Sequence, residues 1–382
     1  MSNCRWAFIP LIVWAAFAQE IRREGPFWVQ TLTGSEPVAA RGRLDIRVPG
    51  SVTLRGGDVA VVSYTCRLRV RASDANEAEQ LLRRSGLQKG RHGETTFLII
   101  GGNANGSTEL QITAPRNLAE VSLVTHGGNL DASNLRGSVR AEAGGGRIRI
   151  DRVDGDVTIR SAGGMTSLGM IGGMVQCLVG GGNIIAESIG GGAVFESGGG
   201  EILVKNVQGP LRATTVGGGI HIMRAGGAVT VSTGGGPLQV DHASGMVVAR
   251  NSGGPIQVGY APGVRCESAS GTIRVNNVSG SMHASTAVGD VTAAYLRDRP
   301  AVDSFLSTGS GDITVVIPSN LSVTVRAENA GSGSAKTIIS EFPGVVVRSQ
   351  GGAVTAQGPI NGGGPLLRLS GNGGMIFIKK EK

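Results

Sequence analysis

The chain has 382 residues, of which 64 are glycine, and it carries a formal net charge of +8 at pH 7. Collagen and flexible linkers are also rich in glycine. Here glycine does not recur at every third position, and ordered apolar residues separate the glycines, which a linker lacks. The charge favours anionic partners such as acidic glycans, envelope polymers, lipid headgroups or nucleic acid, although the basic residues are scattered along the chain.

Residues 1–18 have the pattern of a secretory signal peptide. Arg5 precedes an apolar run from Trp6 to Phe17, and Ala16-Phe17-Ala18 fits a small-x-small cleavage site. The run is short for a bilayer span, and an uncleaved anchor is the alternative. The pattern predicts an exported protein of the periplasm, cell envelope or extracellular space, with no transmembrane span in the mature chain.

Residues 19–125 predict a small β-rich lead-in region that caps the glycine-rich part of the chain. Several segments alternate between apolar and polar residues, which is the strand period. One helix is expected near residues 74–85, where Ser73 or Asp74 can cap it and Ala78, Leu81 and Leu82 supply an apolar side.

One lead-in strand has a basic face that we single out as a candidate contact surface. Arg67, Arg69 and Arg71 alternate with Cys66, Leu68 and Val70, so the arginines share one side of the strand. They could bind an anionic envelope polymer or glycan, or they could form an ordinary solvated strand face. No aromatic residues interleave with these arginines, so no nucleic-acid partner is expected.

Residues 126–293 repeat every 18 residues. Gly-Gly pairs begin at regular intervals, and a third glycine follows ten positions after each pair starts; the pairs are 127–128, 145–146, 163–164, 181–182, 199–200, 217–218, 235–236 and 253–254. Between the glycines, each unit contains two short segments with apolar residues two positions apart. These segments predict two strands per unit, with glycine at the turns.

Stacking of such units predicts an all-β, single-stranded β-solenoid (β-helix) with 18-residue rungs. One unit cannot bury its own inward face, whereas stacked units pair each strand with its counterpart one repeat on, about 4.8 Å away. The handedness and the cross-section are left open. After Ser252 one rung has 17 residues, with the deletion expected at Ala261-Pro262.

The regular pattern ends before the C-terminus. We expect an excursion loop at residues 294–309, because Tyr295, Arg297, Asp298, Arg299 and Pro300 interrupt the strand pattern. Residues 310–382 show irregularly spaced strand signals, which predict either distorted rungs or a C-terminal cap.

The middle rungs carry apolar residues at outward positions. Met165, Met170, Met174 and Ile185 are the candidates for a contact surface, together with Leu178, Val194 and Leu203. Such a patch could bind a protein partner or a second copy of the chain. It could also be covered by the lead-in region or by the excursion loop.

The sequence offers little for catalysis. The densest charged cluster runs from Arg147 to Arg160, and Asp154 and Asp156 within it could form an acid/base pair in a polysaccharide-cleaving β-helix; surface ion pairs are the simpler interpretation. The histidines are scattered, with His221 and His242 in different outward columns. No cysteine or histidine spacing fits a metal site, so we expect no catalytic residues, no cofactor and no metal.

Several short sequence segments resemble those of a known family. Leu44–Gly50, Leu110–Pro115, Gly155–Ile159 and Ser310–Val315 together look like the bacterial β-strand-repeat proteins grouped as putative adhesins, a family with a domain of unknown function. The resemblance covers about residues 40–382. It implies an exported, envelope-associated β-solenoid, and it brings no catalytic residues.

These observations lead to one main interpretation and two alternatives. The main one is an exported, non-enzymatic β-solenoid surface protein with an adhesin-like binding or scaffold role. The first alternative is a polysaccharide-binding or polysaccharide-cleaving β-helix protein, and the second is a solenoid that self-assembles end to end.

Overall fold

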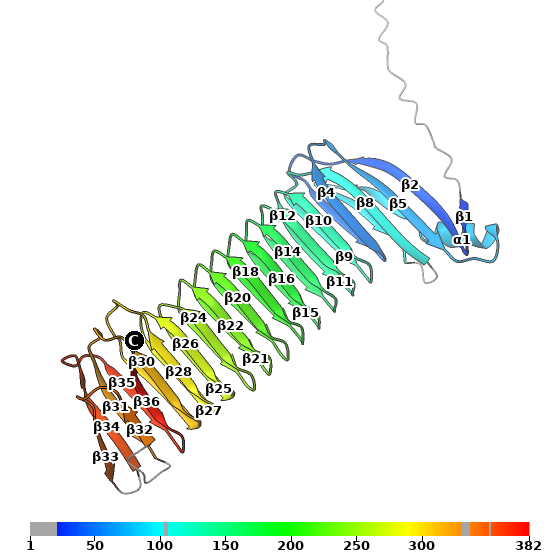
Figure 1. Ribbon diagram of the computed structural model, residues 1–382. Coiled ribbons are helices and arrows are strands. Elements are labelled where there is room, and N and C mark those ends of the chain that lie inside the picture. The colour runs from blue at the N-terminus through cyan, green and yellow to red at the C-terminus, as the bar shows by residue number, and fades with distance from the viewer. Residues whose placement is uncertain (1–20, 103–105, 331–336, 351–352, 382) are drawn as a thin grey trace, which may run out of the picture.

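The computed structural model describes residues 21–102, 106–330, 337–350 and 353–381. The expected signal peptide, residues 1–18, lies outside the described residues. The chain forms an elongated stack of short strands, with β1, β2 and α1 at one end and β31–β36 at the other (Figure 1). The predicted all-β solenoid with 18-residue rungs is confirmed.

The strands belong to two sheets that face each other, so each rung has one strand in either sheet. In spatial order, sheet A contains β1 (Arg22–Glu24), β2 (Phe27–Pro37), β5 (Val61–Val70), β8 (Gly106–Pro115), β4 (Ser51–Gly57), β10 (Leu130–Leu135), β12 (Ile148–Val153), β14 (Thr166–Ile171), β16 (Ile184–Ile189), β18 (Ile202–Val207), β20 (Ile220–Ala225), β22 (Leu238–Ala243), β24 (Ile256–Tyr260), β26 (Ile273–Val278), β28 (Val291–Tyr295), β30 (Ile313–Ile317), β36 (Ile376–Lys380) and β32 (Ile338–Ser340).

Sheet B has the same organisation. In spatial order it contains β6 (Leu87–His92), β7 (Thr95–Ile100), β3 (Arg43–Val48), β9 (Glu120–Thr125), β11 (Ser138–Ala143), β13 (Val157–Ser161), β15 (Val175–Val179), β17 (Ala193–Ser197), β19 (Leu211–Thr215), β21 (Val229–Thr233), β23 (Val247–Asn251), β25 (Val264–Ser270), β27 (Met282–Val288), β29 (Ser304–Ser310), β35 (Leu366–Gly371), β31 (Val323–Asn329), β34 (Ala353–Ile360) and β33 (Val346–Gln350).

Parallel pairing in register explains the 18-residue period. Ile184 pairs with Ile202, and Ile202 pairs with Ile220. Every such inward residue is buried between the two sheets, where Phe195 is the largest fully buried side chain. Each fully buried Ile or Val contributes about 1.5–3 kcal/mol, so the apolar columns hold the stack together. Val247 pairs with Val264, which confirms the 17-residue rung.

The N-terminal region, for which the sequence predicts a β-rich capping lead-in, also contains rungs of the solenoid itself. Strands β3 and β4 form a rung of the solenoid, and this rung lies between the β7/β8 rung and the β9/β10 rung. Strand order in space is therefore not strand order in the chain. Beyond this rung, β5, β2 and β1 extend sheet A in antiparallel fashion, and β6 extends sheet B.

Helix α1 (Ala75–Arg84) lies within the predicted range and packs against β5 and β2 at this end. Asp74 is its N-cap, because the Asp74 carboxylate accepts a hydrogen bond from the Glu77 N–H at 2.9 Å. Ala78 and Leu82 form the buried side of the helix.

The C-terminal end contains a second rung that is out of chain order. Strands β35 and β36 lie between the β29/β30 rung and the β31/β32 rung, and Figure 1 marks the C-terminus beside β30. Strands β34 and β33 then extend sheet B in antiparallel fashion. This end thus combines the two predicted alternatives, rungs and a cap.

The excursion loop is shorter than predicted. Strand β28 continues to Tyr295 and β29 begins at Ser304, so only residues 296–303 leave the stack. The prediction of residues 294–309 was wrong because Tyr295 is buried in the core at 5% exposure and the Ser304–Ser310 segment pairs with both β27 and β35.

Candidate functional site

The corners after the sheet B strands are fixed by a column of buried hydroxyl and amide side chains. Ser197 is representative: its Oγ donates to the carbonyl of Gly182 in the preceding rung at 2.9 Å and accepts from the Gly200 N–H at 3.0 Å. The side chains that bond the preceding corner in this way are Thr125, Ser197, Thr215, Thr233, Asn251, Thr286 and Thr308. These bonds satisfy backbone groups that the turn leaves unpaired.

This column was not predicted from the sequence, although the sequence contains a pattern that marks it. Ser, Thr or Asn precedes most Gly-Gly pairs by two positions, as in Thr215-Val216-Gly217-Gly218. A polar residue at an inward position is favourable only when it has a partner, and the partner here is a carbonyl of the neighbouring rung. Val179 occupies the same position in β15 without a hydroxyl.

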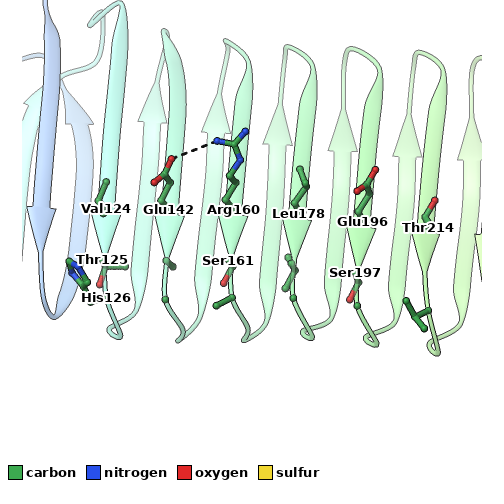
Figure 2. A pocket seen from close by; sticks show the side chains of 17 residues that line it. Val124, Thr125, His126, Glu142, Arg160, Ser161, Leu178, Glu196, Ser197 and Thr214 are labelled. Atoms are coloured by element: carbon green, nitrogen blue, oxygen red, sulfur yellow. Dashed lines mark ion pairs between the residues drawn. The ribbon is translucent and has the colours of Figure 1, made fainter.

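These corners border a shallow groove of about 750 Å³ on the outer face of sheet B, from β9 to β19. Figure 2 shows that one side chain per strand points outward along it, in the order Val124, Glu142, Arg160, Leu178, Glu196 and Thr214. Corner residues complete the lining, and they are small apolar residues, glycines, His126 and the hydroxyl residues Thr125, Ser161 and Ser197. The groove thus runs along the solenoid axis, across the strands.

The charged side chains of the groove are two carboxylates, Glu142 and Glu196, and one guanidinium, Arg160, so negative charge is in excess. Arg160 Nη1 lies 3.9 Å from Glu142 Oε1, an exposed pair that contributes about 1 kcal/mol or less to stability. Glu142 and Glu196 stand on strands three rungs apart, roughly 14 Å by the strand spacing. This separation exceeds the roughly 5–9.5 Å that glycosidases use between their two carboxyl groups. Glu142 and Glu196 therefore do not have the spacing of a glycosidase carboxyl pair.

The basic strand is organised as predicted, with Cys66, Leu68 and Val70 buried on the side opposite Arg67 and Arg69. Arg67 forms an ion pair with Glu24 of β1. The Arg69 guanidinium lies over the ring of Phe27, with Cζ 4.8 Å from the centroid, and Arg71 lies at 6.0 Å.

An aromatic residue thus does accompany these arginines, which the sequence did not reveal. Phe27 comes from β2, and only the antiparallel pairing of β2 with β5 places it there. Part of the positive charge that was expected to face an anionic partner is already engaged within the protein.

The outward apolar residues do not form one patch. Ile185 and Met170 belong to sheet A, whereas Leu178 and Val194 belong to sheet B on the opposite side of the solenoid. Met165, Met170 and Met174 are 41%, 57% and 61% exposed, so neither the lead-in region nor the excursion loop covers them. A partner at these methionines and Ile185 stays a prediction.

Two carboxylates of the charged cluster, Asp151 and Asp156, accept hydrogen bonds from the backbone of the next rung. Asp156 Oδ1 accepts the Met174 N–H at 2.7 Å, and Asp151 Oδ1 accepts the Met170 N–H at 3.2 Å. Both therefore link one rung to the next. This arrangement favours the simpler interpretation of the cluster over a catalytic pair.

A second polar arrangement on sheet A was also missed. His221 Nε2 lies 2.9 Å from Asp241 Oδ2, and Gln239 Nε2 donates to Asp241 Oδ1 at 2.7 Å. The ring of His242 stacks on Tyr260 at 4.6 Å. These residues come from adjacent rungs, so their contacts depend on register and not on sequence spacing.

The three cysteines among the described residues are buried and unpaired. Burial raises the pKa of the Cys66, Cys177 and Cys266 thiols to about 12, which makes them inert packing residues. Within the described part of the chain, no group of three or more His, Cys, Asp or Glu side chains could hold a metal ion. The same residues include no helix that is long and apolar enough to cross a membrane.

The fold is a β-solenoid with an extended groove along one face. The family model described as Toastrack DUF4097 matches residues 51–341. Since this match covers most of the chain, the protein belongs to the Toastrack DUF4097 family, and the resemblance seen in the sequence is confirmed. No curated protein matches the chain.

Solved structures of bacterial proteins are similar to the chain at low identity. A putative adhesin from Bacteroides fragilis is 14% identical, with coverage of 64% of this chain and 96% of that chain and a TM-score of 0.29. A putative adhesin from Parabacteroides merdae is 12% identical, with coverage of 65% and 96% and a TM-score of 0.29. A putative lipid binding protein from Parabacteroides distasonis is 12% identical, with coverage of 92% and 97% and a TM-score of 0.20. TM-scores this low support no inference about a site or a ligand.

Proposed function

We propose that this protein is an exported, non-enzymatic surface protein that holds an extended envelope glycan in the groove of sheet B, in an adhesin-like role. The observation that carries the proposal is the groove itself, which crosses six strands from β9 to β19. A polymer that lies along the solenoid axis can make the same kind of contact at every rung.

The lining suits a glycan strand. Sugar rings have apolar faces that can lie on small residues such as Ala162 and Val216, and their hydroxyl groups can bond to Glu142, Arg160, Glu196 and Thr214. Because two carboxylates and only one guanidinium line the groove, this site favours a neutral polymer over an acidic one.

End-to-end self-assembly finds little support in the terminal strands. The edge strands β1 and β32 are three residues long, and the edge strand β6 carries Lys89 and Arg91. Short and charged edges prevent strand addition, so we favour a solenoid that acts as a single rod.

The test uses a substitution that places a large side chain in the groove. Ala162 is an exposed corner residue in the groove, so Ala162→Trp fills space without disturbing the core. Ala287 occupies the equivalent corner of β27, is also exposed, and lies outside the groove. It therefore supplies a matched control, Ala287→Trp.

We expect the mature protein to bind one or more polymers on an array of neutral and acidic envelope glycans, and Ala162→Trp to weaken that binding about tenfold or more. Ala287→Trp should bind like the unmodified protein. Equal binding by all three proteins would contradict the proposal, as would the release of shortened glycan, which would indicate cleavage.

A further inference from the structure

A second cavity lies on the same sheet, toward the C-terminal end of the solenoid. It has a volume of about 610 Å³ and is lined by residues of β23, β25, β27, β29 and β35. This volume falls within the range of about 300–1,000 Å³ that is typical of small-ligand sites. Residues of the groove that runs from β9 to β19 take no part in it.

An in-register ladder of basic and aromatic side chains crosses this cavity. Arg265 pairs with His283, His283 with Phe305, and Phe305 with Arg368. The His283 and Phe305 rings lie 5.2 Å apart, and Arg368 Cζ lies 5.9 Å from the centroid of the Phe305 ring. All four side chains point to the outer face of sheet B, where they are exposed or half-buried.

The out-of-order rung completes the ladder. Arg368 belongs to β35, which inserts between β29 and β31. Without this insertion, Phe305 would face a different neighbour and the cavity would lack its C-terminal side. The topology therefore brings together residues that are about 100 positions apart in the chain, from Arg265 to Arg368.

The positive charge of this ladder is poorly neutralised. Arg368 and its register partner Arg326 form no ion pair with any residue that the structure describes. Like charges directly opposite each other on adjacent strands are destabilising. An anion bound beside them would relieve this repulsion.

The acidic groups nearby are already engaged. Glu267 contacts Arg250 at 3.1 Å and Arg265 at 3.9 Å. Asp303 Oδ1 accepts the Leu366 N–H at 2.7 Å, so this carboxylate fixes the start of β35. The cavity thus retains an excess of positive charge with an aromatic ring in its centre.

We propose that this cavity binds an acidic saccharide, with Arg265 and Arg368 holding carboxylate groups and Phe305 contacting a sugar ring. Guanidinium groups form paired hydrogen bonds with carboxylates, and the two arginines stand on opposite sides of Phe305 along the solenoid axis. The arginines are therefore placed to bind charged groups on separate sugars of one chain.

The occupant is a saccharide because two features of the cavity fit it better than other anions. A free inorganic anion or the phosphate of a lipid headgroup would use the arginines but not the Phe305 ring. This site is separate from the glycan groove of sheet B and does not depend on it.

The test measures binding of polygalacturonate oligosaccharides by isothermal titration calorimetry. We expect Arg265→Gln and Arg368→Gln each to weaken binding about tenfold. Arg212→Gln is the matched control, because Arg212 is exposed in the same outward column of sheet B on β19 and lies outside both cavities. Neutral dextran oligosaccharides should bind at least about tenfold more weakly than polygalacturonate.

Phe305→Leu separates a saccharide site from a general anion site. It should weaken polygalacturonate binding without altering the response to inorganic phosphate, and circular dichroism verifies the fold of each variant. The proposal is overturned if Arg212→Gln weakens binding as much as Arg368→Gln, or if phosphatidylglycerol vesicles or phosphate bind as tightly as the uronate. Ala162 lies outside this cavity. The binding measured for Ala162→Trp therefore tests the groove alone, and a failure of one proposal can be distinguished from a failure of the other.

Discussion

The two glycines of each corner pair have different structural roles. A Cβ on Gly181 would meet no atom within 4 Å, whereas a Cβ on Gly182 would overlap the carbonyl of Gly164 in the preceding rung. The same division recurs in the next pair, where Gly199 is open and Gly200 approaches the Gly182 carbonyl. Close packing of successive corners therefore requires glycine only at the second position.

This asymmetry makes a direct prediction. Gly182→Ala forces two corners apart and should lower the free energy of unfolding by about 3 kcal/mol. Gly181→Ala adds a methyl group to open space and should change it by only about 0.5 kcal/mol. Thermal melting followed by circular dichroism measures both, and equal melting temperatures for the two variants would contradict the explanation.

At the residue scale, the sequence predicts the core better than the contacts of the surface. Inward residues such as Ile184 and Val204 can be predicted, because apolar residues two positions apart that recur every 18 residues must face the core of a stacked solenoid. The aromatic partner of Arg69 could not be predicted from such a pattern. Phe27 reaches it through an antiparallel register that depends on the whole N-terminal region.

At the scale of elements, both ends of the solenoid contain a rung that is out of chain order. Strands β3 and β4 insert near the N-terminus, and β35 and β36 insert near the C-terminus. Every rung has the same alternation of apolar residues and similar turns, so local sequence does not specify which rung lies beside which. The capping role could thus be predicted, but the spatial order could not.

The inserted C-terminal rung, β35 and β36, should stabilise the end of the solenoid, and we call this rung the clasp. Leu367 is fully buried between the sheets in β35, whereas its neighbour Leu366 is 38% exposed. Leu367→Asp buries an unpaired carboxylate, which is costly, and should expel β35 and β36. Strands β31 and β32 would then lose their parallel neighbours, and, among the described strands, β34 and β33 pair with the solenoid only through β31.

Hydrogen exchange with mass spectrometry measures this effect. In Leu367→Asp we expect faster exchange throughout residues 304–381, while β10–β22 stay protected. Leu366→Asp should exchange like the unmodified protein. Exchange that increases only within residues 366–380 would show that the clasp does not hold β31–β34.

At the scale of the whole molecule, the solenoid is quasi-one-dimensional, because each rung contacts mainly its two neighbours. The three buried thiols report on different parts of this stack: Cys66 lies in β5 near the N-terminal end, Cys177 in β15 near the middle, and Cys266 in β25. Ends of such stacks open more readily than the middle. Thiol labelling therefore measures local opening along the rod.

The same thiols make stability depend on pH. Burial raises the pKa of each thiol from an ordinary value of 9.0 to about 12, so above pH 9 the unfolded chain binds fewer protons than the folded one. Their contribution is fully present below pH 9 and is lost as the pH rises from 9 toward 12. Between these values each thiol lowers the free energy of unfolding by up to about 1.4 kcal/mol per pH unit.

Two measurements check this behaviour. At pH 8, a thiol reagent should leave Cys66, Cys177 and Cys266 of the native protein unmodified, and with increasing denaturant Cys177 should react last. A variant with alanine at positions 66, 177 and 266 should lose stability less steeply between pH 9 and 10 than the unmodified protein. Rapid labelling of native Cys177, or identical pH slopes for the two proteins, would contradict the burial of these thiols and with it the stacking of intact rungs around them.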